Sequence, residues 1–226
     1  MPYFYMSDKM ISSFDDLHKV VQSYGTDTVI YRGVTKDSHE LIPDIGRYDG
    51  ISSSKIEREE KRILRMFKEQ AVPYLRFIPR TEWEWLAIAR HHGLPTRLLD
   101  WSRNSLVGAY FAVEKKHKGD SVVYAYHSEK YIRTDKKLDP FAIDHVGKFI
   151  PTHITPRITA QVGVFTIHPE PKSPFKSSDV DRLIIRSSAR EKLKWILYRY
   201  GIHRASLFPD LDGLAWHLKW LRTDIY

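Results

Sequence analysis

The chain has 226 residues, 42% of them hydrophobic, which is enough to bury a core in one large domain or two small ones. It contains no cysteine, which excludes a disulfide framework, a thiol nucleophile and thiolate zinc sites. The 36 Lys and Arg against 28 Asp and Glu give a formal net charge of +8, an excess that attracts polyanions such as nucleotides or nucleic acid. Because no run of five or six basic residues occurs, a solvated basic surface is an equally good interpretation.

Targeting signals are absent from the sequence pattern. Residues 1–10 lack the charged-then-apolar order of a signal peptide, and no apolar run approaches the roughly 18 residues that span a bilayer. We therefore expect a cytoplasmic protein that makes no membrane contact.

The first predicted elements are a helix and a strand. Ser13 precedes apolar residues at helical spacing, and Gly25 follows them, which predicts a capped amphipathic helix. The β-branched and aromatic stretch Thr28–Tyr31 predicts a strand that runs directly into Arg32. We therefore expect this arginine at a strand end.

A long loop to Ser53 comes next, followed by two helices. Capping boxes at residues 54–57 and 81–84 each open an apolar pattern of helical period. The helix that begins at residues 54–57 should stop before Pro73, and the helix that begins at residues 81–84 should end at Gly93. A further helix is expected near Asn104.

The second half of the chain predicts strands and then helices. Strands are expected at residues 121–126, 162–167 and 181–186. A capping box at residues 188–191 predicts a helix that stops at Gly201, and a last helix should run from about Pro209 to Leu221. These elements predict one mixed α+β domain over residues 1–226, with helices around a mostly antiparallel sheet; residues 1–27 form an N-terminal helical segment before a core over 28–226.

A group of polar residues lies in the turn that we expect between the helix ending at Gly93 and the helix near Asn104. Its members are Arg97, Asp100, Trp101, Ser102 and Asn104. A polar cluster between two apolar helices is either a site or a network that fixes a buried corner. In the second case Asp100 would pair with Arg97 or cap the following helix.

Several standard sites lack their minimum parts. The chain has no GxxxxGK[ST] loop, no GxGxxG and no HExxH. His91 and His92 are adjacent, so they cannot form the i, i+4 pair of a helical metal site. We therefore expect no metal.

Five separated motifs resemble the FRG domain family, named for its (F/Y)-R-G motif. They are Tyr31-Arg32-Gly33, residues 92–102 (HGLPTRLLDWS), residues 110–112 (YFA), residues 160–165 (AQVGVF) and residues 207–215 (LFPDLDGLA). The resemblance covers most of the chain from Tyr31 onward. It implies a bacterial or phage protein, often suspected of a role in phage conflict, but it gives little function because members are largely uncharacterised.

The order of these motifs also resembles that of ADP-ribosyltransferases of the arginine–serine–glutamate type. That resemblance implies an ADP-ribosyltransferase-like fold that uses NAD as substrate. Arg32 would bind the diphosphate, Thr96 or Ser102 the nicotinamide ribose, and Trp101 or a nearby tyrosine would stack on the nicotinamide ring. The other positions implied for dinucleotide binding are Tyr31, Gly33 and Arg97. We expect Gly33 to leave an open approach for the ligand.

The catalytic carboxylate of that family has no clear counterpart here. Gln161 stands at the position of the glutamate, but an amide cannot stabilise an oxocarbenium-like centre as a carboxylate does. Asp100 or Asp210 could supply the charge instead. Asp210 could equally complement the dipole of the last helix or act as a general base with a shifted pKa.

Three functions follow as alternatives. The first is an NAD-binding ADP-ribosyltransferase-like enzyme, such as a toxin or phage-defence effector, that modifies a nucleic acid or protein and has an antitoxin or phage protein as partner. The second is a nucleic-acid-binding or nuclease module that uses the basic surface and exposed aromatics. The third is a non-catalytic interaction domain in which the motifs are purely structural.

Overall fold

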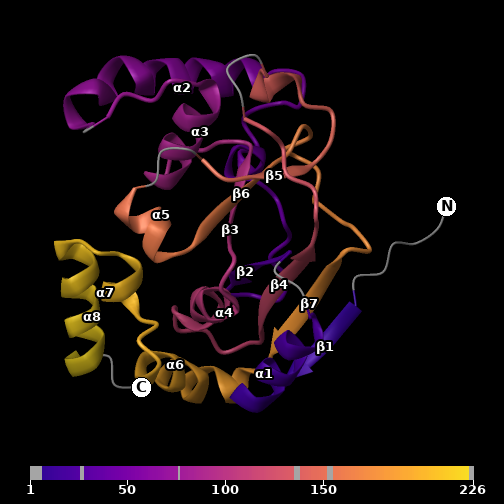
Figure 1. Ribbon diagram of the computed structural model, residues 1–226, viewed down its shortest axis with the longest axis vertical. Coiled ribbons are helices and arrows are strands. Elements are labelled where there is room, and N and C mark those ends of the chain that lie inside the picture. The colour runs from indigo at the N-terminus through magenta and orange to yellow at the C-terminus, as the bar shows by residue number, and fades with distance from the viewer. Residues whose placement is uncertain (1–6, 26–27, 76, 135–137, 152–154, 224–226) are drawn as a thin grey trace.

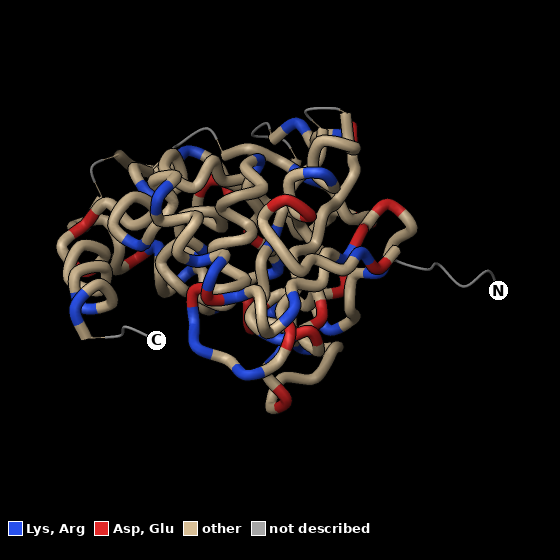
Figure 2. The backbone as a smooth tube through the Cα atoms, turned by 90° about the horizontal axis from the view of Figure 1, so that it is seen from below, with Lys and Arg blue, Asp and Glu red and all other residues tan. Residues whose placement is uncertain are grey.

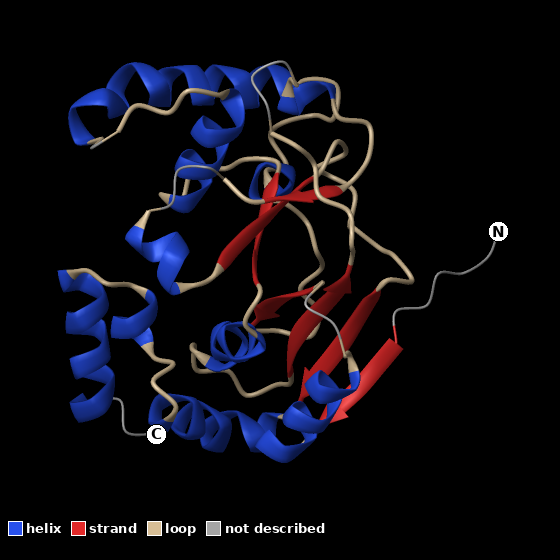
Figure 3. Cartoon of the chain, viewed as in Figure 1, coloured by secondary structure: helices blue, strands red, loops and turns tan. Residues whose placement is uncertain are grey.

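The computed structural model describes residues 7–25, 28–75, 77–134, 138–151 and 155–223. A seven-stranded mixed sheet forms its centre, in the order β1-β7-β4-β2-β3-β6-β5 (Figures 1 and 3). The strands are β1 (Ser7–Ile11), β2 (Val29–Val34), β3 (Leu98–Ser102), β4 (Ser121–His127), β5 (Gly147–Phe149), β6 (Gly163–Ile167) and β7 (Val180–Ile185). The pair β1–β7 is parallel and the other pairs are antiparallel, so the predicted α+β class with a mostly antiparallel sheet is confirmed.

Helices surround this sheet. The α-helices are α1 (Phe14–Ser23), α2 (Ile56–Ala71), α3 (Glu82–His91), α4 (Ser105–Val113), α5 (Pro156–Ala160), α6 (Arg190–Arg199), α7 (Arg204–Leu207) and α8 (Leu211–Thr223). Short 3-10 helices are η1 (Asp44–Arg47), η2 (Val72–Tyr74), η3 (Pro140–Ala142) and η4 (Ser187–Ala189). None of the helices in the described ranges is both long enough and apolar enough to cross a bilayer.

The core is divided between the two halves of the sheet. One cluster joins α1, α4 and α6 to strands β1, β7, β4 and β2. A second joins α2 and α3 to strands β3, β6 and β5. A third joins residues of β2, β4 and β7 to residues of β3 and β6 under the loops around Leu41 and Phe175, so it spans both halves. Figure 1 shows the same division, with α2 and α3 at the top and α1 and α6 at the bottom.

The two halves meet where β2 and β3 diverge. Along the whole described sheet these two strands pair at one position, Tyr31 opposite Ser102. By contrast β2 is paired with β4 from Val29 to Val34, and β3 is paired with β6 from Leu98 to Ser102. The sheet is therefore split between β2 and β3, and we call this opening the fork.

A tight helix contact holds the lower half of the sheet together at the same place. A Cβ built on Gly33 would lie 2.0 Å from the carbonyl oxygen of Gly108, and one built on Gly108 would lie 2.8 Å from the Cβ of Tyr31. Only glycine allows this approach of α4 to β2. The expected role of Gly33, an open approach for a ligand, is therefore corrected, because α4 occupies that space.

The structure corrects several predicted boundaries. Residues 98–102 form β3 rather than a turn, and Arg32 lies inside β2, which continues to Val34. The predicted capping boxes at 54–57 and 188–191 do not form, because each helix begins later, after Lys55 and Ala189, which make no side-chain cap. Thr81 does accept the hydrogen bond predicted for it from the Glu84 amide.

Candidate functional site

Arg32 reaches across the fork from β2 to β3. Its Nη1 donates to the backbone carbonyl of Asp100 at 2.6 Å and lies 3.5 Å from the Asp100 carboxylate. The strands lack ladder hydrogen bonds here, so the guanidinium takes their place. The Arg32 side chain is 20% exposed. Arg32 therefore links the two strands, while part of its side chain remains exposed to solvent.

Asp100 is the centre of an ion-pair network. Arg90, from α3, donates to Asp100 Oδ2 from Nε at 2.9 Å and from Nη2 at 2.7 Å. The Nη1 of Arg90 also contacts Asp44 in η1. Desolvation acts to raise the pKa of Asp100, but the charges of Arg90 and Arg32 outweigh it, so its pKa lies below the ordinary value. Asp100 is thus an ionised carboxylate, and its side chain is 40% exposed.

Two further residues extend this network along the surface. Desolvation and the charge of Arg157 lower the pKa of His91 to about 4, so this imidazole is neutral near pH 7. Arg157, from α5, places its guanidinium 4.1 Å from the centroid of the Phe208 ring. Its Nε is buried without a hydrogen-bond partner in the described part of the chain. We call Arg32, Arg90, Asp100, Asp44 and Arg157 the fork cluster.

Arg97 does not pair with Asp100, as one of the alternatives had it. Its Nε donates to Glu60 Oε2 at 2.9 Å, and its backbone amide donates to Glu60 Oε1 at 2.6 Å. Both side chains are almost fully buried, at 2% and 1% exposure. The guanidinium also lies 4.4 Å from the Phe141 ring centroid. Arg97 is therefore a buried structural residue without access to a ligand.

The other polar residues of this segment are also used internally. Thr96 is fully buried. Trp101 is 3% exposed and donates its indole N–H to Thr166 Oγ1, so its ring has no free face for nicotinamide. The Ser102 hydroxyl donates to the Gln161 carbonyl at 2.6 Å and accepts from the Asn104 amide. The segment that resembles the transferase motif thus offers Asp100, and not these side chains, to the surface.

Gln161 and Asp210 lie at helix ends. The Gln161 amide donates to the Leu207 carbonyl at 3.1 Å, which ties the end of α5 to α7. Asp210 is exposed and accepts from the Gly213 amide at 2.6 Å in the first turn of α8. This is the helix-start interaction given above as one alternative for Asp210. Tyr31, 6% exposed, is a core residue.

Several residues of the site were not predicted. Glu60 follows Ile56 and precedes Leu64 at i, i+4 spacing, so the period of α2 could have marked it as buried. Arg90, Asp44 and Arg157 carried no such signal, because their convergence depends on how α3, η1 and α5 pack around β3. Within the described residues, no group of three or more His, Asp or Glu is arranged to hold a metal ion.

Residues 27–121 match the family model of the FRG domain. The chain carries an FRG domain. The match runs from β2 to the first residue of β4, so Arg32, Asp44, Arg90 and Asp100 of the fork cluster all belong to the FRG domain. Neither the curated proteins nor the solved structures include one with significant similarity to the chain.

Proposed function

We propose that this FRG protein binds a dinucleotide such as NAD at the fork and transfers its ADP-ribose group to an acceptor. The observation that carries the proposal is the convergence of Arg32 and Asp100 where β2 and β3 separate. A split sheet with an arginine and a carboxylate at its opening offers a diphosphate contact beside a charge that stabilises a cationic sugar.

The state of Arg32 supports the diphosphate contact. Among the described residues only its Nη1 makes a hydrogen bond, which leaves Nε and Nη2 for a ligand. The fork cluster contains three arginines and two aspartates, so a diphosphate would enter a cluster that carries excess positive charge. Arginine suits this role because its planar donors match phosphate oxygens in pairs.

The contacts of Asp100 support the transfer of the ADP-ribose group. Both neighbouring arginines contact Oδ2, and within the described chain Oδ1 accepts no hydrogen bond. In the transfer, the bond between ribose C1′ and the nicotinamide nitrogen breaks, and nicotinamide leaves with the bonding electrons. The acceptor then bonds to C1′ and loses its proton. An ionised Asp100 would stabilise the positive charge on the ribose ring. Gln161, whose amide is occupied by Leu207, is left out of this assignment.

The experiment compares NAD binding and nicotinamide release in three variants. Arg32→Ala should weaken NAD binding in calorimetry by at least tenfold, since each charge-assisted hydrogen bond contributes about 1.5–3 kcal/mol. Asp100→Asn should keep most of the binding but lose nicotinamide release measured by chromatography. Arg182→Ala is the matched control, because Arg182 is also a partly exposed strand arginine paired with an aspartate, Asp8.

Two results would contradict the proposal. One is NAD affinity that is equal in the wild type, Arg32→Ala and Arg182→Ala. The other is binding only to DNA or RNA, with steep salt dependence, which would favour the nucleic-acid alternative. Figure 2 shows Lys and Arg interspersed with Asp and Glu along the chain rather than gathered in one run.

A further inference from the structure

A second candidate binding site lies outside the fork. An open cavity of about 580 Å³ is lined by α4 and the loop after it, α6, α7 and α8, and its lining includes neither Arg32 nor Asp100. This volume falls in the range of about 300–1,000 Å³ that is usual for small-molecule sites. Half of its lining residues carry an aromatic or imidazole ring, namely Tyr110, Tyr198, His203, Trp216, His217 and Trp220.

Trp216 is the exposed aromatic residue of this cavity. It is 57% exposed and stacks on no other aromatic ring among the described residues, while the Nζ of Lys219 lies 4.9 Å from its ring centroid. Trp220, one helical turn further along α8, is instead packed against Trp195 at a centroid distance of 4.7 Å. An exposed indole beside a cavity is a stacking surface for a planar ligand.

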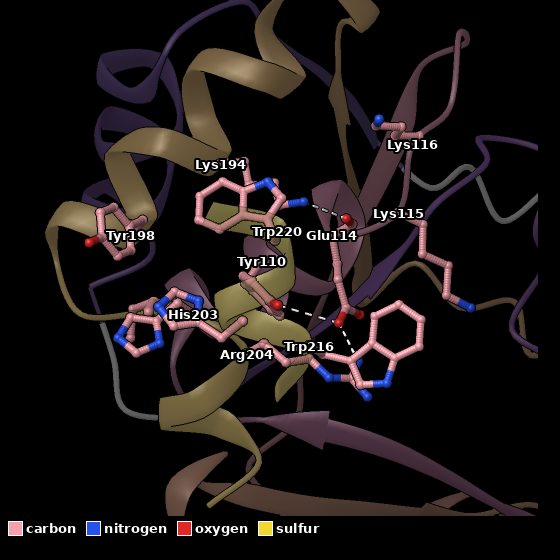
Figure 4. Close-up of a pocket in the computed structure, with 12 residues that line it drawn as sticks. Tyr110, Glu114, Lys115, Lys116, Lys194, Tyr198, His203, Arg204, Trp216 and Trp220 are labelled. Carbon is pink, nitrogen blue, oxygen red and sulfur yellow. Dashed lines mark hydrogen bonds and ion pairs between the residues drawn. The ribbon is translucent and has the colours of Figure 1, made fainter. Parts of the chain in front are cut away.

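The charge around the cavity is positive. Its lining has four cationic side chains against one carboxylate, that of Glu114. Arg204 pairs with Glu114, and Lys194 donates to the Glu114 backbone carbonyl at 2.8 Å. Lys115 and Lys116 are exposed. In the view of Figure 4, Glu114 lies between the indoles of Trp216 and Trp220, and the two lysines lie beyond it.

Histidines and an indole nitrogen complete the wall. His203 and His217 stack at a centroid distance of 4.1 Å. Desolvation lowers the pKa of both imidazoles, so they add no charge near pH 7. His217 Nδ1 and Trp220 Nε1 are buried without hydrogen-bond partners in the described part of the protein. Because buried polar groups are usually paired, these atoms are not explained by the fold alone.

We propose that this cavity binds a nucleotide, with the base stacked on Trp216 and the phosphate held by Lys115 and Lys116. A nucleotide combines a planar ring, which fits the aromatic wall, with a negative charge, which matches the net positive charge of the lining. The shared chemistry is a base with its phosphate, whether free or at the end of a single strand. This inference does not rest on the proposed reaction at the fork.

The test uses the full chain and AMP as the probe, followed by tryptophan fluorescence and calorimetry. AMP should bind, whereas adenosine and ribose 5-phosphate should each bind at least tenfold more weakly, because each lacks one of the two contacts. Trp216→Ala should weaken AMP binding by about tenfold to a hundredfold, which is the usual loss for one base–aromatic stack. A variant with Lys115→Ala and Lys116→Ala should reduce the salt dependence of binding.

Leu218→Ala is the matched control, since Leu218 is 51% exposed on the same helix and does not line the cavity. It should leave AMP affinity unchanged.

An oligonucleotide that binds more tightly than AMP, with the same loss in Trp216→Ala, would identify the end of a single strand as the ligand. Binding of the oligonucleotide that is equal to or weaker than that of AMP would identify a free nucleotide. No binding of AMP or oligonucleotide at millimolar concentration would overturn the inference. Equal binding of AMP and ribose 5-phosphate would overturn it as well. Arg32→Ala should leave AMP binding unchanged, which separates this site from the fork.

Discussion

Two positions near β3 use similar charged groups for opposite purposes. Immediately before the strand, Arg97 pairs with Glu60, and both side chains are almost completely buried. Three residues later, Asp100 pairs with Arg90 and Arg32 while 40% of its side chain remains exposed. Burial makes the first pair costly to break, whereas solvent screens the second. One motif therefore contains a structural ion pair and an ion pair that a ligand could reach.

The largest effect is expected at the buried pair of Arg97 and Glu60. Glu60→Ala leaves the Arg97 guanidinium buried without its partner, so the free energy of unfolding should fall by about 3–5 kcal/mol. Urea denaturation measures this change. Glu57→Ala is the control, because Glu57 is 49% exposed and lies 3.9 Å from Arg97, and it should cost about 0.5 kcal/mol or less. Equal losses in the two variants would show that burial does not make the Arg97–Glu60 pair more important than the exposed Arg97–Glu57 contact.

The free energy of unfolding should also depend on pH, because a chain of hydrogen bonds next to Arg97 contains a buried histidine. Thr166 Oγ1 accepts from Trp101 and lies 2.8 Å from His168 Nε2, and burial lowers the pKa of His168 to about 3. Its ordinary pKa is about 6.5, so between these values the unfolded chain binds more protons than the folded one. The free energy of unfolding should therefore fall as the pH drops from about 6.5 towards 3, by up to about 1.4 kcal/mol per unit from this group.

Urea denaturation at several pH values measures that slope. His168→Gln retains an amide oxygen near the Thr166 hydroxyl but cannot titrate, so its slope should be shallower than that of the wild type. A remaining slope is expected from His91, whose pKa is also lowered, to about 4. Parallel curves for the two proteins would show that His168 does not contribute.

The smallest effect on stability is expected at Asp100, in the middle of β3. Asp100→Asn removes a charge that is 40% exposed, while Arg90 keeps its contact with Asp44. The free energy of unfolding should fall by less than the loss of about 3–5 kcal/mol expected for Glu60→Ala, because Asp100 is partly exposed although Arg90 is only 12% exposed. A loss as large as that of Glu60→Ala would mean that Asp100 is also structural, and the proposed role at the fork would then lose its support.

The sequence predicted the positions of helices and strands better than the contacts between them. Local signals were enough for α1, α3 and α4, because Ser13, Thr81 and Asn104 cap their helices through contacts within a few residues. The strand β3 was missed because Asp100 and Ser102 have turn-like character, although Leu98, Leu99 and Trp101 are buried.

The site depended on contacts that no local signal encodes. Arg97 and Asp100 are three residues apart, so an ion pair between them was a reasonable expectation. In an extended strand, however, residues three apart point to opposite faces, and each found a partner on another helix. The convergence of Arg32 with Asp100, 68 residues later, likewise follows from the order of strands in the sheet.

That strand order also bears on where the folding unit ends. Residues 27–121 contain β2 and β3 but exclude all of β6 and all of β4 beyond its first residue. These excluded strands are the outer neighbours of β3 and β2, which themselves share one paired position. A chain trimmed to the matched residues would keep the signature yet expose two unpaired strand edges, which favour aggregation. The FRG signature thus marks the middle of a cooperative unit, and expression of an isolated signature segment should fail for a topological reason.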